Sequence, residues 1–147
     1  MQTAPVTEKP RAKRIRVVLR FVPAIVWMGV IYFLSDQTGE ELNTFLPWMQ
    51  KLFPMMSDFN WGHFAAYFIL ALSFDYGFGS NSDRLPVKLV IVMLCLLYGV
   101  TDEYHQSFVG GRTPDWHDLR NDTIGAALAV LTTSLPWVRK LRTKLGG

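Results

Sequence analysis

Acidic side chains and one histidine are the residues of this chain whose types and spacing could carry chemistry. The acidic residues are Asp102, Glu103, Asp115, Asp118 and Asp122. Together with His63, they provide carboxylates and an imidazole, the groups that general acid–base catalysis uses. The same side-chain types are ligands of divalent metal ions. The last three aspartates are spaced i, i+3 and i+7, so on a helix they share one face.

Four apolar blocks must position these side chains, at residues 17–34, 61–78, 85–98 and 124–138. Each block is shorter than the roughly 20 residues that cross a bilayer, so each must extend into its flanks. The third and fourth blocks lack the polar face of a helix in a soluble bundle. Half of the chain is apolar and 18% is charged, which excludes a disordered chain. The sequence therefore predicts an all-α fold, a bundle of four transmembrane helices.

The basic residues are distributed unevenly around these blocks. Twelve of the 15 Lys and Arg residues lie before the first block or near its start, around the second connection, or after the fourth block; this count includes Arg20 near the start of the first block and Lys88 near the start of the third. By the positive-inside rule, both termini are predicted to be cytoplasmic (N-in/C-in). The expected domains are a basic cytoplasmic tail at 1–14, a four-span membrane domain at 15–138 and a second basic cytoplasmic tail at 139–147. Because topology explains the net charge of +3, nucleic acid is not an expected partner. Membrane lipids are expected partners, and no oligomeric state is predicted.

The connections contain further local signals. Apolar residues at helical spacing over 42–53 predict a short helix in the outer membrane interface, interrupted at Pro47. Thr113 is a plausible N-cap with Pro114 at the first helical position, which predicts that the fourth span begins there. Small residues four positions apart predict close contacts between helices. The pairs are Gly62 with Ala66 and Gly125 with Ala129.

With this topology, nine of the 12 acidic residues and all three histidines lie on the outer side of the membrane. A helix cannot present carboxylates to lipid, so these side chains must face the other spans or a water-filled pocket. Arg112 lies among them, and its guanidinium is shaped for a bidentate contact with phosphate or carboxylate. A structural ion pair of Arg112 with Glu103 or Asp115 is the equally weighted alternative. We expect the Tyr67 hydroxyl to form a hydrogen bond to a neighbouring span.

Several separated motifs resemble the VanZ-like family of membrane proteins, over roughly residues 20 to 135. The motifs are Phe33-Leu34-Ser35-Asp36-Gln37, Gly62-His63 followed by Tyr67, residues 102–108, Gly111-Arg112, Asp115, Asp118, Asn121 and Gly125. The resemblance implies a multi-pass protein of the bacterial cytoplasmic (inner) membrane with a site on its outer face. The founding member of the family is associated with resistance to the glycopeptide teicoplanin. Family members often have an Asp-Lys pair where this chain has Asn60-Trp61, and Pro-Gly where it has Gly110-Gly111.

From these residues and the resemblance, we expect a site that binds the anionic headgroup of an envelope precursor or a glycopeptide. The candidate ligand-binding residues are Gln37, His63, Tyr67, Glu103, Gln106, Arg112, Asp115, Asp118 and Asn121. The alternative is a membrane enzyme acting on a lipid-linked or cell-wall substrate, with or without a metal ion. Its candidate catalytic residues are His63, Asp102 and Glu103. No H-E-x-x-H or similarly spaced ligand set occurs, so neither a metal nor another cofactor is predicted. A third interpretation is that the polar residues only hold the helices together.

Overall fold

The computed structural model describes residues 10–52 and 60–146, and all regular structure within them is helical. The helices are α1 (Pro10–Leu19), α2 (Val22–Ser35), α3 (Gly39–Leu52), α4 (Asn60–Phe78), the 3-10 helix η1 (Gly79–Asp83), α5 (Leu85–Gln106), α6 (Trp116–Ser134) and α7 (Pro136–Gly146). The predicted all-α fold is therefore confirmed. The polar segment over 79–83, between the second and third apolar blocks, forms η1 and reverses the chain.

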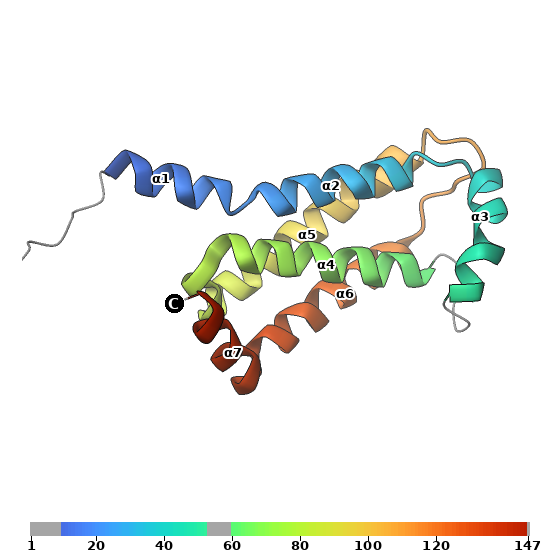
Figure 1. Cartoon of the computed structure of the whole chain (residues 1–147). Helices are drawn as coiled ribbons and strands as arrows, with labels where there is room; N and C mark the ends of the chain where they lie inside the picture. Colours follow the sequence, from blue (N-terminus) through green and yellow to red (C-terminus); the bar gives the residue numbers. More distant parts are fainter. Residues whose placement is uncertain (1–9, 53–59, 147) are drawn as a thin grey trace, which may run out of the picture.

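Four helices run alongside one another, with α4 packed against α2, α5 and α6 (Figure 1). Helix α3 lies across one end of this bundle, whereas α1 and α7 lie at the other end. Two helical segments, Ile15–Ser35 and Leu85–Gln106, are long and apolar enough to cross a membrane. The structure is thus consistent with a membrane protein.

The outward-facing side chains of the bundle are largely apolar. Phe33 of α2 is 67% exposed, Leu89 of α5 is 59% exposed, and Leu131 of α6 is 63% exposed. The core between the helices includes small residues such as Ala71 and Ala126. Large exposed apolar patches on a protein mark surfaces that contact other proteins or membranes.

Helix α6 begins two residues later than the sequence analysis predicted. Its N-cap is Asp115, not Thr113, and the Asp115 carboxylate accepts a hydrogen bond of 2.8 Å from the backbone N–H of His117. The backbone of Asp115 is extended (φ −128°, ψ 124°), as an N-cap requires. The helix ends at Ser134, because the residue before Pro136 is disfavoured in helical conformation. The chain then turns into α7 instead of continuing the fourth span to residue 138.

The short helix predicted over 42–53 corresponds to α3. This helix is continuous through Pro47, so the predicted interruption there is wrong. Its amino end is closed by a capping box. The backbone N–H of Thr38 donates to the Glu41 carboxylate at 2.8 Å, and the backbone N–H of Glu41 donates to the Thr38 hydroxyl at 3.3 Å. The contacts with Thr38 hold the pKa of Glu41 below its ordinary value. This capping compensates for a proline in the helix interior, which removes one backbone donor.

The start of α3 lies directly against the connection between α5 and α6. The backbone N–H of Gly39 donates to the carbonyl of Gly110 at 3.3 Å. A Cβ atom on Gly39 would lie 2.6 Å from the carbonyl oxygen of Gly111, which itself has a positive φ of 75°. Both positions therefore require glycine. This contact fixes the connection that carries Arg112.

Paired charges hold α7 against the other end of the bundle. Arg142 of α7 contacts a carboxylate oxygen of Asp75 on α4 at 2.6 Å and also pairs with Asp83 of η1. The second oxygen of Asp75 lies 3.7 Å from the Lys88 ammonium and accepts a hydrogen bond of 3.1 Å from Thr133. Asp75 and Lys88 are both buried, and each has a partner of opposite charge. The buried charges at this end of the bundle are therefore paired.

Of the two glycines predicted to allow close helix contacts, only Gly125 does so. A Cβ atom on Gly125 would lie 2.4 Å from the Phe64 carbonyl oxygen on α4, whereas a Cβ atom on Gly62 would meet nothing within 4 Å. The expectation for Gly62 is wrong because this residue does not face a neighbouring helix. Gly125 sets the spacing between α4 and α6.

We predict that a Gly125→Ala substitution lowers the melting temperature, since the added methyl group forces α4 and α6 apart at a cost of about 1–3 kcal/mol. Gly62→Ala is the matched control and should leave the melting temperature unchanged or raise it slightly. Thermal unfolding of both variants in detergent micelles tests this. Equal melting temperatures would contradict the close approach.

Candidate functional site

Buried polar side chains from four helices meet at the end of the bundle that α3 covers. We call this group the polar cluster. It consists of Ser35 from α2, His63 from α4, Asp102, Glu103 and Gln106 from α5, and Asp118 and Asp122 from α6. The parallel α4 and α6 contribute their first turns and α5 contributes its last, so these residues lie at a similar height along the bundle (Figure 1).

His63 is held between two aspartates of α6. Its Nδ1 lies 2.9 Å from Asp122 Oδ1, and its Nε2 lies 3.7 Å from Asp118 Oδ2. The two aspartates are four residues apart and so lie on one helix face. Asp122 is fully buried and orients the imidazole, which leaves Nε2 directed toward the other carboxylates.

A chain of hydrogen bonds connects the α5 side of the cluster to Arg112. The Gln106 amide donates to the Ser35 hydroxyl at 2.6 Å and to Asp102 Oδ2 at 3.3 Å. Its carbonyl oxygen accepts a hydrogen bond of 2.6 Å from Arg112 Nη2. The ion-pair interpretation required Arg112 to pair with Glu103 or Asp115. The structure shows Arg112 bonded to Gln106 instead. Arg112 is half-buried at the edge of the cluster.

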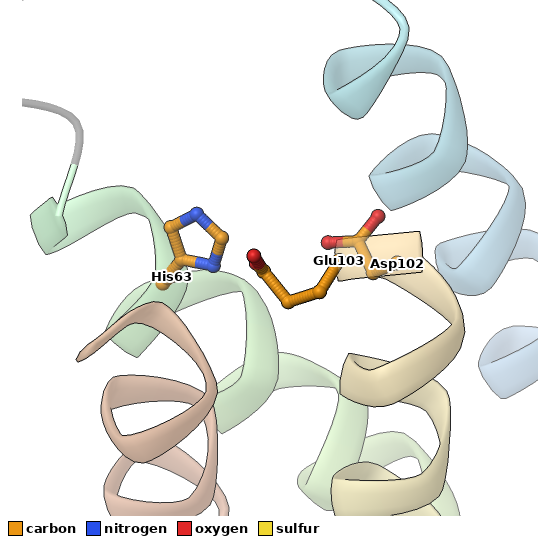
Figure 2. A group of neighbouring side chains, drawn as sticks. All are labelled: His63, Asp102 and Glu103. Atoms are coloured by element: carbon orange, nitrogen blue, oxygen red, sulfur yellow. The ribbon is translucent and has the colours of Figure 1, made fainter. Parts of the chain in front are cut away.

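Glu103 uses one carboxylate oxygen for support and leaves the other without a partner. Glu103 Oε2 accepts a hydrogen bond of 2.8 Å from the backbone N–H of Asp115, whereas Oε1 is buried and has no hydrogen-bond partner in the described residues. Figure 2 shows Glu103 extending from α5 toward His63 on α4, with Asp102 beside it. One ligand atom from each of these three residues lies within 4.8 Å of the other two.

The interior of the cluster is largely shielded from solvent. The side chains of His63 and Asp118 are 12% and 14% exposed, and Asp102 and Glu103 are buried. Arg112, at the edge of the cluster, is half-buried.

Several candidate residues lie outside this group. Gln37 donates to the carbonyl of Phe33 in its own helix at 3.0 Å. The side-chain oxygen of Asn121 accepts a hydrogen bond of 3.4 Å from the neighbouring Arg120. The carboxylate of Asp115 is half-exposed and caps α6, so only its backbone N–H reaches the cluster.

The Tyr67 hydroxyl was expected to bond to a neighbouring span, and this expectation is wrong. Tyr67 is fully buried, but its hydroxyl has no hydrogen-bond partner in the part of the chain that the structure describes. The ring instead packs next to Asp122 beside Gly99, where a Cβ atom would lie 2.8 Å from Asp122 Oδ2 and 3.6 Å from the Tyr67 ring. Tight packing of the three helices at Gly99 leaves the hydroxyl away from an acceptor.

The sequence analysis placed Asp122 on one helix face with Asp115 and Asp118, but it did not name Asp122 among the candidate ligand-binding or catalytic residues. Ser35 appeared within a motif and was also absent from those two lists. The other two histidines also lie outside the cluster, since His105 stacks on Tyr32 and His117 is exposed.

A family model described as VanZ/LLP1 matches residues 21–136. This range contains every residue of the polar cluster and most of the chain. The chain belongs to the VanZ/LLP1 family. The match begins at the residue before α2 and ends where α7 begins, so the family region of this VanZ-like protein is the bundle from α2 to α6. No curated protein and no solved structure matches the chain.

We predict that the cap at Asp115 makes the stability of the VanZ-like bundle depend on pH at low pH. Hydrogen bonds from the backbone and side chain of His117 lower the pKa of Asp115 from its ordinary value of 3.8. A lowered pKa in the folded state means that the stabilisation is complete above pH 3.8 and is lost as pH falls further. Asp115→Asn keeps a capping oxygen without the charge. The wild type should therefore melt above this variant at pH 7, and the difference should shrink below pH 3.8. A pH-independent difference would contradict the assignment.

Proposed function

We propose that this VanZ-like protein spans the bacterial cytoplasmic membrane four times, with both termini inside, and binds the anionic headgroup of a cell-envelope component at its outer face. Helix length supports the four spans. At 1.5 Å per residue, the 19 residues of α4 and of α6 each extend roughly 28 Å, close to the thickness of a hydrocarbon core. The segment Ile15–Ser35 and α5 are longer.

The two ends of the bundle differ in the way that the positive-inside rule requires. Basic residues of α7 and the start of α5 lie at the end away from α3. Their side chains pair with Asp75 and Asp83. The polar cluster lies at the opposite end, which this orientation assigns to the outer face.

The observation that carries the headgroup proposal is the position of Arg112. Its guanidinium is held by Gln106 at the edge of the cluster, at 2.6 Å. A guanidinium has five N–H donors in a planar fork, so the bond to Gln106 leaves donors for a phosphate or carboxylate. Because the founding family member is associated with teicoplanin resistance, we propose that the headgroup belongs to a cell-wall precursor or to the glycopeptide itself.

We predict that the topology can be demonstrated by cysteine labelling. In a Cys95→Ala background, Thr113→Cys should react with a membrane-impermeant maleimide in intact cells. Lys144→Cys should react only after the membrane is opened. Both residues are exposed, so labelling reports the side of the membrane and not burial. The reverse pattern, or labelling of both in intact cells, would contradict the N-in/C-in arrangement.

We predict that Arg112→Ala weakens binding of a short-chain polyprenyl phosphate to the purified protein by about tenfold or more, since a hydrogen bond to a charged group contributes about 1.5–3 kcal/mol. Arg120→Ala is the matched control, because Arg120 is an exposed arginine near the same end that contacts Asn121. Calorimetry in detergent measures the affinities.

In a glycopeptide-sensitive Gram-positive host, the wild type and Arg120→Ala should reduce teicoplanin susceptibility, and Arg112→Ala at equal membrane levels should not. Equal affinity of both variants would contradict headgroup binding, and equal susceptibility of all strains would contradict the link to teicoplanin.

A membrane enzyme is the second candidate function, favoured by the contact between His63 and Asp122. A buried carboxylate at Nδ1 orients an imidazole and stabilises its protonated form, while Nε2 accepts a proton from an attacking water. Mass spectrometry of the polyprenyl phosphate after the binding experiment distinguishes the two candidates. Release of phosphate would favour the enzyme, and an unchanged lipid favours the binding protein.

A further inference from the structure

We infer that the polar cluster is a binding site for a divalent transition-metal ion, with His63, Asp102 and Glu103 as protein ligands. One nitrogen or oxygen atom from each residue lies within 4.8 Å of the other two. Ligand atoms that share one Zn²⁺ ion at about 2.1 Å are roughly 3–4 Å apart. Small side-chain rotations therefore convert the observed arrangement into a coordination site, and Figure 2 shows Glu103 directed from α5 toward His63 on α4.

The charge of the cluster calls for a cation. Asp102, Glu103, Asp118 and Asp122 contribute four carboxylates, and three of them belong to fully or almost fully buried residues. Within the described residues, the basic side chains near these carboxylates are His63, His105, which also contacts Asp36, and Arg112, which is held by Gln106. Buried charges in proteins are paired or coordinate metal ions. The opposite end of the bundle obeys this rule, since Asp75 there has both Lys88 and Arg142.

An unpartnered oxygen marks the position of the ion independently of this charge. Glu103 is only 8% exposed, and its Oε1 has no hydrogen-bond partner in the described part of the chain. The side chain extends toward His63 (Figure 2). A buried acceptor without a donor is unfavourable, and a bound cation satisfies it.

Each proposed ligand is also held by a second interaction that leaves one atom available. Asp122 holds His63 through Nδ1, which is the carboxylate–histidine–metal arrangement of many metal sites. The Asp115 N–H holds Glu103 through Oε2, and Gln106 holds Asp102 through Oδ2. These interactions restrain all three side chains near one another, as a metal site requires.

Asp118 completes the surroundings of the ion. Its Oδ2 lies 3.7 Å from His63 Nε2, and its Oδ1 is buried without a hydrogen-bond partner among the described residues. Asp118 is therefore placed to act as a fourth ligand or to accept a hydrogen bond from a metal-bound water.

The ligand types select the class of ion. One imidazole nitrogen with carboxylate oxygens suits Zn²⁺ or Mn²⁺, whereas Mg²⁺ and Ca²⁺ favour oxygen ligands alone. A bound ion also offsets the acidic surplus that would repel an anion near Arg112. This role in headgroup binding rests on the proposed function, but binding of the ion itself does not.

Calorimetry on the full-length protein in detergent, stripped with EDTA and without added lipid, tests the site with the chlorides of Zn²⁺, Mn²⁺, Mg²⁺ and Ca²⁺. We expect one Zn²⁺ or Mn²⁺ per chain, bound at least tenfold more tightly than Mg²⁺ or Ca²⁺. Glu103→Gln keeps the side-chain shape and should weaken binding by at least tenfold. Asp122→Asn should weaken it by about 10–100-fold, because it acts through His63. Glu40→Gln, an exposed residue of α3, is the matched control and should bind as the wild type does.

Folded wild-type protein that binds no stoichiometric ion would overturn the inference without reference to any variant. Equal affinity of Glu103→Gln and Glu40→Gln, with helical circular dichroism unchanged in both, would also overturn it. Metal binding without binding of the polyprenyl phosphate supports the metal site and contradicts the proposed headgroup function. Binding of the polyprenyl phosphate that survives EDTA, in a protein that binds no metal, supports the proposed headgroup function and contradicts the metal site.

Discussion

The contact between His63 and Asp122 is the interaction on which the arrangement of the site depends. It joins α4 to α6 at 2.9 Å, and Asp122 is fully buried. Two glycines make the contact possible. Gly125 lets α6 approach the backbone of α4, and Gly99 on α5 leaves space for the Asp122 carboxylate. The polar contact and the small residues around it therefore form one packing unit.

The two ends of the bundle solve the problem of buried charge differently. At the α7 end, Asp75 has partners on α5 and α7, and the resulting network ties the end of the chain to the bundle. At the α3 end, carboxylates outnumber cations and Glu103 has an unpartnered oxygen. Polar groups inside a membrane are costly to leave without partners. This contrast is the reason that we propose the α3 end, and not the α7 end, as the functional end.

The cover of the site is built from local turn chemistry. The capping box at Thr38 and Glu41 starts α3, and the contact between Gly39 and Gly110 holds it against the connection that follows α5. That connection carries Arg112, which Gln106 then orients toward the cluster. In our proposal, an ion inside the cluster and the guanidinium at its edge together form the surface that takes an anionic group.

The sequence by itself determined the helical class, the four apolar blocks and the uneven distribution of basic residues, because hydropathy and charge are local properties. It placed the start of α6 two residues early, since Thr113 and Asp115 are both good caps and only the folded backbone selects one. Which polar residues meet was decided by the tertiary structure. Spacing puts Asp118 and Asp122 on one face, but the rotation of α6 against α4, set by packing at Gly125, brings that face to His63. The same rotations leave Gln37 outside the cluster and the Tyr67 hydroxyl unpartnered, and no pattern along the chain encodes them.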